Sequence, residues 1–346
     1  MPTKTASSTT TRRRRTATKT TTSTGAGATH RGAGVTGEGE VPLRPLGRAG
    51  ELVSALGLGG YHLGLVESER EAVRLVHEAV DAGVTFMDNA WEYNEHRSEE
   101  LMGKALAGGW RERTFLMTKV CTHGRDAKTA MRQLEQSLRR LKTDRIDLWQ
   151  VHECAYYNDP ERHFAKGGVI EALDVAKASG KVRYVGFTGH KDPAIHLRML
   201  SYDYPFDTVQ MPLNAFDATF AHSFEQRVLP ELLRRGIAPI GMKSMSGEGQ
   251  PVKKRAVSAE EALRYAMSLP VATTVSGIDS LRVLRQNLRI ARGFTPMSPA
   301  EMQALRTRVF EAASDGRFEP YKTTAKHEGD EGRKQHGFPP MSEVAM

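Results

Sequence analysis

The chain has 346 residues, 39% of them hydrophobic, and a net charge of +8 at neutral pH. That length accommodates one large domain or two ordinary ones, and the apolar content supports a substantial core. No apolar run approaches the roughly 18 residues that a membrane-spanning helix needs, so we expect no membrane partner. The two cysteines, Cys121 and Cys154, fit a reducing compartment, and we expect a cytoplasmic protein without a disulfide framework.

The positive charge is concentrated at the start of the chain. Residues 1–40 hold seven basic residues against two acidic ones, a net +5, which leaves +3 for the other 306 residues. This tail is rich in Thr, Ser, Gly and Ala, and we predict that it is disordered. Its run Arg12-Arg-Arg-Arg15 either contacts nucleic acid or acidic surfaces or is a solvated arm. The nearly neutral body indicates no nucleic-acid partner.

After the tail, short apolar runs alternate with amphipathic helices. Residues 41–47 and 51–57 are predicted to form a hairpin that leads into the first strand. The first long helix is predicted to begin at Ser68, with Glu71 completing a capping box and Gly83 ending the helix. Strands are predicted near residues 53–58, 84–88, 114–119, 146–152, 183–188, 207–211, 237–242 and 272–276. Seven further helices are predicted over residues 98–106, 127–141, 170–179, 193–201, 224–235, 258–268 and 280–291, and an extra helix over 299–313.

Eight strands alternating with eight helices over roughly 250 residues predict an α/β fold of the (β/α)8 TIM barrel class. The alternative is an open doubly wound sheet, which usually carries G-x-G-x-x-G after its first strand. Here Gly57-Leu-Gly59-Gly60 matches only in part. We therefore predict a tail over 1–40, a barrel over 41–320 with an extra helix near its end, and a polar tail over 321–346. The polar C-terminal segment should lie across the barrel mouth or be partly disordered.

Three predicted strands in succession end on an ionisable side chain. Asp88, Lys119 and His152 occupy these ends, and Tyr93 follows the first of them by five residues. A buried parallel strand has little reason to end on a charge unless that end opens onto a working pocket. Neighbouring strands lie about 4.8 Å apart, so these side chains can meet across one pocket.

The four residue types suggest proton transfer to a substrate oxygen. A lysine ammonium within about 4 Å favours a phenolate by up to roughly 4 kcal/mol, so Lys119 should lower the pKa of Tyr93 from its usual value of about 10. Asp88 would keep the lysine charged, and His152 would orient a carbonyl or relay a proton. None of the four supplies a hydride, so the scheme requires a nicotinamide cofactor.

These residues resemble the catalytic motifs of the aldo-keto reductases, and the resemblance covers about residues 42–320. Met87-Asp88-Asn-Ala-Trp-Glu-Tyr93 resembles the family's D-T-A-x-x-Y segment, Met117-Thr-Lys119 its T-K strand end, and Trp149-Gln-Val-His152 its L-x-H strand. The resemblance implies a (β/α)8 barrel that reduces carbonyls with an Asp-Tyr-Lys-His tetrad. It also implies that the cofactor is NADP(H), with NAD(H) as the alternative cofactor. Trp91 is a candidate for the substrate pocket.

The resemblance also implies cofactor-binding positions at the later strand ends. Gln210 matches a glutamine that meets the nicotinamide amide, and Asn287, which follows Ser276 and Gly277, falls where an asparagine meets the adenine. Arg282, Arg285 or the start of the helix at Ser280 can receive a 2′-phosphate, or these arginines are a solvated helix face.

Two of these strand ends depart from the usual pattern. The usual G-V-S-N-[FY] is Gly186-Phe-Thr188-Gly189-His190, in which Thr188 keeps a hydroxyl and Gly189 lacks an amide. The usual Tyr-Ser is Met242-Lys243, so a methionine would have to cover the nicotinamide ring. This combination resembles a divergent bacterial branch of the family, some of whose members carry an iron–sulfur extension for which this chain lacks the cysteines.

We therefore predict an NADP(H)-dependent reductase of small aldehydes or ketones, with Tyr93 as general acid. One alternative is a nucleotide-sensing subunit with little turnover. A second is a lyase that forms a Schiff base on Lys119 or Lys243. A zinc site formed by Cys121, Cys154 and His123 lacks the paired ligand spacing, so no metal is predicted. The sequence indicates neither the particular substrate nor the oligomeric state.

Overall fold

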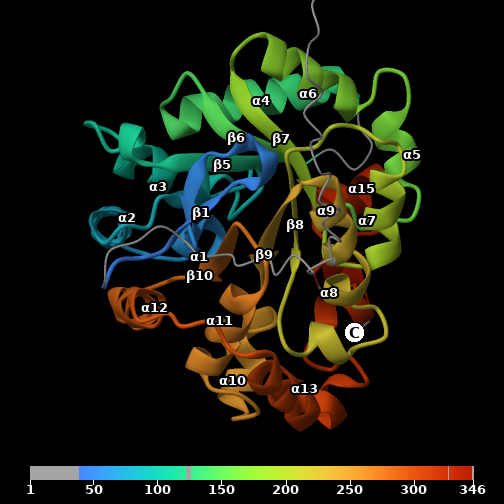
Figure 1. Cartoon of the computed structure of the whole chain (residues 1–346). Helices are drawn as coiled ribbons and strands as arrows, with labels where there is room; N and C mark the ends of the chain where they lie inside the picture. The colour runs from blue at the N-terminus through green and yellow to red at the C-terminus, as the bar shows by residue number, and fades with distance from the viewer. Residues whose placement is uncertain (1–38, 122–125, 326, 345–346) are drawn as a thin grey trace, which may run out of the picture. The chain divides into compact units, whose positions relative to one another are not determined.

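The computed structural model describes residues 39–121, 126–325 and 327–344. Nearly all of the predicted N-terminal tail and His123 therefore lie outside the described residues. Eight parallel strands close into a barrel in the order β10-β3-β4-β5-β6-β7-β8-β9, with helices around them (Figure 1). The predicted (β/α)8 fold is confirmed.

The barrel strands follow the predicted ones within a few residues. They are β3 Leu56–Gly59, β4 Phe86–Asp88, β5 Phe115–Val120, β6 Ile146–Val151, β7 Val182–Thr188, β8 Thr208–Pro212, β9 Ala238–Met242 and β10 Thr273–Gly277. The main helices are α2 Glu69–Asp81, α3 Arg97–Ala105, α4 Ala127–Leu141, α6 Val169–Ala178, α7 Pro193–Leu200, α9 Leu229–Arg235, α11 Ala259–Ser268, α12 Leu281–Arg292 and α13 Pro299–Ala313.

Short helices in the connecting segments were not predicted, because four to six residues are too few to show a helical period. They are α1 Gly60–Gly64, α5 Asp159–Phe164, α10 Gln250–Lys253, α14 Pro320–Thr323 and α15 Asp330–Gln335. The predicted helix over 224–235 is instead split into α8 Phe224–Arg227 and α9, which carries Pro230 in its first turn. Proline lacks the N–H that would continue a helix and favours the start of a new one.

The residues predicted to begin and end α2 do so, but only half of the predicted capping box forms. The Ser68 hydroxyl accepts a hydrogen bond from the Glu71 backbone N–H at 3.3 Å, which is one half of the predicted capping box. After the helix, Gly83 has a φ of +94°, a conformation that side chains other than glycine rarely adopt. The buried face of α2 is the predicted one and consists of Ala72, Leu75, Val76, Ala79 and Val80.

The predicted hairpin closes the amino end of the barrel. Its strands, β1 Leu43–Pro45 and β2 Leu52–Ser54, pair antiparallel. Leu46 and Val53 are fully buried in one cluster with Phe86, Phe115 and Ala238, the first residues of three barrel strands. Burial of a leucine contributes about 1.5–3 kcal/mol. Because the hairpin covers the amino end of the barrel, a ligand-binding site can form only at the carboxyl ends of the strands.

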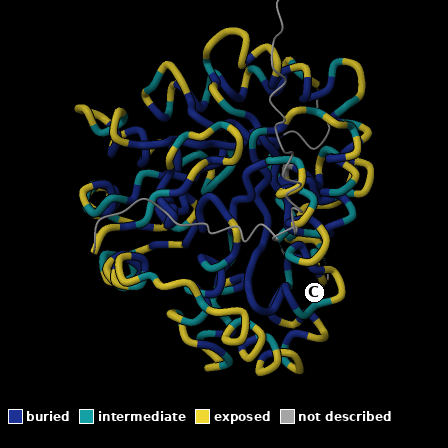
Figure 2. Tube along the Cα trace, in the orientation of Figure 1, coloured by how far each residue is buried: buried dark blue, intermediate teal, exposed yellow. Residues whose placement is uncertain are grey.

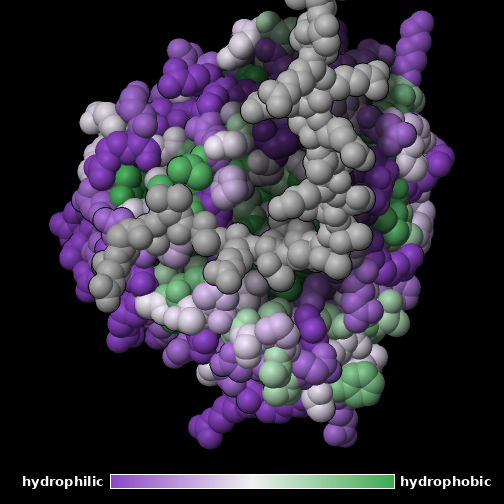
Figure 3. All heavy atoms as spheres, in the orientation of Figure 1, coloured by the Kyte–Doolittle hydropathy of each residue, from purple (hydrophilic) through white to green (hydrophobic). Residues whose placement is uncertain are grey.

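Burial follows the layers of the fold. The barrel strands and the inner helix faces are buried, whereas the outer helix faces are exposed (Figure 2). On the face in Figure 3, hydrophilic side chains surround small, separate hydrophobic patches. Within the described ranges, none of the helices has the length and apolarity to cross a membrane.

The C-terminal segment after α13 is fastened by a buried ion cluster. Lys322 Nζ lies 2.6 Å from Asp217 Oδ1 and 2.8 Å from Glu319 Oε2, and all three residues are buried. Further along, Glu328 accepts hydrogen bonds from Tyr156 in the loop after β6 and from Lys191 in the loop after β7. The segment therefore lies over loops at the carboxyl end of the barrel.

We expect Lys322→Met to destabilise the fold by about 3–5 kcal/mol, because two buried carboxylates would lose their cation. Chemical denaturation measures the change, and Lys334→Met, at an exposed position of α15, is the control. A loss below about 1 kcal/mol, the range of surface ion pairs, would contradict the role of the cluster.

Candidate active site

Three members of the predicted tetrad, Asp88, Tyr93 and Lys119, meet at the carboxyl end of the barrel around the ammonium group of Lys119, and His152 lies beside Tyr93. Lys119 Nζ lies 2.8 and 3.0 Å from the two carboxylate oxygens of Asp88, 2.8 Å from the carbonyl oxygen of Asn89 and 3.2 Å from the hydroxyl of Tyr93. The strand register explains this meeting, because β4 and β5 are direct neighbours. Lys119 and Asp88 are 1% and 2% exposed.

A polar layer lies above an apolar one inside the barrel. Phe86, Met117 and Leu148 belong to the apolar cluster toward the amino end. Two residues further along β4 and β5 come Asp88 and Lys119, since alternate strand residues share a face. The Asp88 carboxylate also accepts a hydrogen bond of 2.9 Å from the side-chain amide of Gln210 on β8. The buried ion pair is thus held by three strands.

The electrostatics of Tyr93 differ from the prediction. Burial raises the pKa of Tyr93 well above 10, and the carboxylates of Asp88 and Glu92 raise it further. The expected lowering by Lys119 is wrong for this state of the protein, because Asp88 compensates the charge of the ammonium. Burial also lowers the pKa of Lys119 from 10.5, an effect that Asp88 opposes. The phenol therefore stays protonated at neutral pH.

His152 packs against the ring of Tyr93. The two ring centroids are 5.4 Å apart and the rings are nearly perpendicular, at 80°. The Nδ1 atom of His152 contacts the Oε1 atom of Glu92, the residue directly before Tyr93. Tyr61 of α1 turns its ring edge-on to Tyr93, at 5.5 Å between centroids. The phenol is thereby flanked by an imidazole and a second phenol.

A second carboxylate–imidazole pair lies beside the tetrad. Glu153 Oε1 is 3.1 Å from Nε2 of His190, which follows β7. Burial lowers the pKa of His190 well below 6.5, and the charge of Lys243 lowers it further, so this imidazole is neutral. Lys243 places its ammonium 4.9 Å from the ring centre of Tyr321 in α14, and burial lowers the pKa of this lysine as well.

The C-terminal segment reaches the tetrad at Gly329. A Cβ atom on Gly329 would lie 3.3 Å from Glu153 Oε2 and 3.4 Å from Glu92 Oε2. The backbone of the chain thus comes close to both carboxylates, Glu153, which follows His152 in sequence, and Glu92, which contacts its imidazole.

Two of the predicted cofactor-binding residues lie at the end of β7 and just beyond it. Thr188 is buried at the last position of the strand. At Gly189, a Cβ atom would lie 2.5 Å from the carbonyl oxygen of Cys154 and 2.9 Å from the ring of His196. The local backbone therefore excludes the asparagine that the family usually carries here.

The remaining cofactor candidates follow β9 and β10. Met242 ends β9 half-buried, and Lys243 follows with a φ of +54°. Ser276 and Gly277 end β10 beside β3. The side-chain amide of Asn287, buried on α12, donates to the Ser276 hydroxyl at 2.9 Å.

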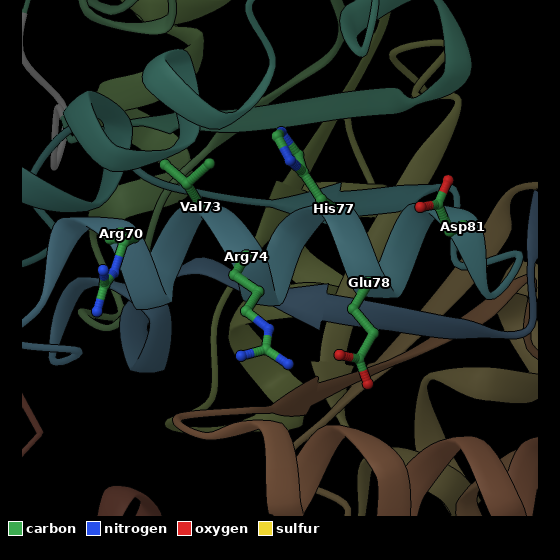
Figure 4. Close-up of a pocket in the computed structure, with 6 residues that line it drawn as sticks. All are labelled: Arg70, Val73, Arg74, His77, Glu78 and Asp81. Carbon is green, nitrogen blue, oxygen red and sulfur yellow. The ribbon is translucent and has the colours of Figure 1, made fainter.

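The predicted arginines of α12 differ in their contacts. Arg285 pairs with Glu78, which projects from α2 in Figure 4, at 2.6 Å. Arg282 is exposed near the N-terminus of α12, and it forms no ion pair with the residues that the structure describes. Of these two cations, Arg282 is the one left for a ligand.

Trp91 is engaged elsewhere than at the tetrad. Its indole N–H donates to the side-chain oxygen of Gln136 on α4 at 2.8 Å, and Arg140 of α4 lies over its ring. A role of Trp91 in the pocket stays a prediction.

Several residues at the mouth were not predicted as site residues. Glu92 and Glu153 directly adjoin the tetrad in sequence, and this adjacency to Tyr93 and His152 is the signal that could have found them. Tyr321 carried no such signal, because it is far along the chain from the strand-end motifs that it meets here. Cys121 and Cys154 are both buried and free of disulfides. Among the described residues, no three His, Cys, Asp or Glu side chains are grouped so that they could hold a metal ion.

Comparison with known proteins identifies the family to which the chain belongs. The profile of the aldo/keto reductase family matches residues 55–257, more than half of the chain. The chain therefore belongs to the aldo/keto reductase family.

Two relatives and two solved structures illustrate the range of similarity. The uncharacterized oxidoreductase YrpG of Bacillus subtilis is 35% identical over 159 residues, which cover 41% of this chain and only 47% of that protein. The 6-dehydroglucose reductase of Novosphingobium aromaticivorans is 29% identical over 287 residues, or 73% of this chain and 91% of that one. The holo form of aldo-keto reductase AKR11C1 from Bacillus halodurans superposes with a TM-score of 0.65 at 25% identity, covering 78% of this chain and 96% of that one. An aldo-keto reductase from Klebsiella pneumoniae in complex with NADPH has a TM-score of 0.62 at 20% identity, covers 78% of this chain and 94% of that one, and supports the fold alone.

The named relatives give no support to the nucleotide-sensing alternative, and the surroundings of Lys119 give none to a Schiff base on that lysine. The named relatives are oxidoreductases, and nothing in them points to a nucleotide-sensing subunit. A Schiff-base lysine needs a nucleophilic amine, whereas Lys119 Nζ is surrounded by four hydrogen-bond partners and ion-paired to Asp88.

Proposed function

We propose that the protein is an NADP(H)-dependent oxidoreductase that reduces aldehydes or ketones with Tyr93 as general acid. The observation that carries this proposal is the 3.2 Å contact between the Tyr93 hydroxyl and the Lys119 ammonium, itself neutralised by Asp88. When the hydroxyl proton moves to a substrate oxygen, the phenolate that remains is stabilised by this ammonium. Groups that are placed in advance where charge develops give the largest catalytic effects.

The described residues fit a nicotinamide dinucleotide. Gln210 and Asn287 are both fully buried, and their side-chain oxygens have no hydrogen-bond partner among the described residues. Such buried acceptors cost free energy unless a ligand donor meets them. We propose that Gln210 and Thr188 meet the nicotinamide amide, Asn287 the adenine, and Arg282 the 2′-phosphate. A bound reduced nicotinamide would supply the hydride.

Gly189 and Met242 would contribute close backbone approach and an apolar surface to this site. We assign them no hydrogen bond to the cofactor. Ser276 and Gly277 at the end of β10 would line the route between Asn287 and the barrel mouth. The Klebsiella pneumoniae aldo-keto reductase, which shares the fold, forms a complex with NADPH, and this agrees with the proposed cofactor class.

The mouth of the barrel favours a polar carbonyl substrate. Glu92, Glu153, His190 and Lys243 surround the tetrad, and carboxylates, imidazoles and ammonium groups pair well with hydroxyl groups. A similar protein is named for 6-dehydroglucose. We therefore place oxidised sugars beside simple aldehydes in the substrate panel.

Tyr93→Phe should lower kcat for carbonyl reduction by about 10²–10⁴, because the variant lacks the proton donor. Binding of NADPH, followed by quenching of protein fluorescence, should remain nearly intact. Tyr202→Phe, in which a hydroxyl near Arg198 on the outer helix α7 is removed, is the matched control. Equal turnover by Tyr93→Phe would refute the role of Tyr93.

The alkaline side of the pH profile should report Lys119. The pKa of Tyr93 is raised and that of Lys119 is lowered from 10.5, so the ammonium loses its proton first as the pH rises. We expect kcat of the wild type to fall at a pH below 10.5. The residual activity of Lys119→Met should lack this fall, while Lys104→Met, an exposed surface variant, should keep it. An unchanged alkaline limb in Lys119→Met would count against the electrostatic role of the lysine.

Arg282→Ala should raise the KM for NADPH about tenfold or more and leave the KM for NADH unchanged, because a charged hydrogen bond contributes about 1.5–3 kcal/mol. Arg285→Ala is the control, since the Arg285 guanidinium already forms an ion pair with Glu78. Equal KM changes for both nucleotides would place the 2′-phosphate elsewhere.

A further inference from the structure

The loop between β4 and α3 carries, besides Tyr93, an acidic side chain that the proposed chemistry does not yet use. The Oε1 atom of Glu92 is in contact with Nδ1 of His152, but the angles between the two groups are not those of a hydrogen bond. The side chains are 16% and 12% exposed, so this contact is largely shielded from water. The same imidazole presents its edge to Tyr93.

We propose that Glu92 is a positioning residue that fixes the orientation and the tautomer of His152. In the working arrangement that we propose, the carboxylate and the imidazole align so that Glu92 accepts the Nδ1–H, and Nε2 is presented to the substrate oxygen beside the Tyr93 hydroxyl. The inference rests on the proposed function for the substrate oxygen, but the contact itself does not depend on turnover.

The tautomer follows from the chemistry of the two groups. A neutral imidazole carries its proton on one ring nitrogen, and the partner of each nitrogen decides which one. An ionised carboxylate only accepts hydrogen bonds, so the nitrogen that faces it must carry the proton. In serine proteases a buried carboxylate holds an imidazole in the same way, by its Nδ1–H.

The loop holds Glu92 in place. Asn94, Glu95 and His96 all have positive φ values, of 51°, 53° and 77°, which gives the segment a tight turn. The side-chain amide of Asn94 donates to the Tyr61 carbonyl at 2.8 Å and to the Ser98 hydroxyl at 2.9 Å. These contacts tie the loop to α1 and α3.

The second oxygen of Glu92 is covered from the other side. A Cβ atom on Gly329 would lie 3.4 Å from Oε2, so the C-terminal segment limits how far the carboxylate can move from His152. The neighbouring carboxylate, Glu153, faces Nε2 of His190 instead, at 3.1 Å. Each of these two imidazoles at the mouth thus has its own carboxylate, and Glu92 serves the one that touches Tyr93.

The decisive measurement is the protonation pattern of His152 by ¹⁵N NMR at about pH 8, above the usual histidine range. The spectrum of His152→Gln assigns the signal by its loss. We expect the Nδ1–H tautomer in the wild type. In Glu92→Gln, whose amide can donate to Nδ1, we expect a shift toward the Nε2–H form. Glu95→Gln, an exposed neighbour in the same loop, should leave the signal unchanged.

Kinetics provide the second readout. Glu92→Gln should lower kcat about 10–100-fold, the effect usual for a partner that orients a working imidazole, with little change in the KM for NADPH. Glu92→Asp should recover part of kcat. A residue that serves only stability would change the melting temperature and leave the tautomer and kcat alone.

Two outcomes would overturn the inference. One is a wild-type Nε2–H tautomer, and the other is a Glu92→Gln variant with the wild-type tautomer and kcat. If the wild type reduces no carbonyl in the panel, the proposed function fails, and the NMR comparison still decides between a positioning and a merely structural Glu92.

Discussion

The buried ion pair of Lys119 and Asp88 is the interaction on which the rest of the site depends. Removing each charge from water costs several kcal/mol, and only close pairing with further hydrogen bonds offsets that cost. Here the ammonium has four oxygen neighbours, and the carboxylate has the additional amide of Gln210. The partners come from β4, β5, β8 and the loop after β4. The closed barrel holds these distant segments in register. The hairpin that covers the amino end of the barrel keeps water from reaching the ion pair from that side.

The same pair explains why Tyr93 is a phenol and not a phenolate at rest. An unpaired ammonium 3.2 Å away would favour the ionised form, but Asp88 cancels most of that charge and Glu92 adds a negative one. In the mechanism that we propose, the hydroxyl keeps its proton until an oxygen with growing negative charge takes it. The ammonium is then already in contact with the oxygen that would become anionic, and no side chain would have to move. Such an arrangement would favour the transition state more than the resting protein.

The sequence contained most of the fold and the centre of the site, and the reasons are local. Period-2 and period-3.6 patterns, Ser68 at a helix start and Gly83 at a helix end depend on neighbouring residues alone. The meeting of Asp88, Lys119 and Tyr93 followed from strand ends in a barrel whose strand order is the chain order. The sign of the Tyr93 pKa shift did not follow, because it depends on burial and on the full set of surrounding charges. The approach of Tyr321 and Gly329 to the mouth depends on long-range packing for which one sequence offers no periodic signal.

The departures from the family pattern at the mouth are physically connected. Gly189 is required where the carbonyl oxygen of Cys154 comes within 2.5 Å of the space for a Cβ atom, so the usual asparagine amide is absent. The next residue, His190, then packs against Glu153, and the charge of Lys243 helps to keep it neutral. Lys243 in turn lies against Tyr321 of the C-terminal segment, in the region where an aromatic residue of β9 would otherwise be expected. One change of residue size at a strand end thus goes together with a mouth lined by carboxylate–imidazole pairs, and this lining is the reason why we propose polar substrates.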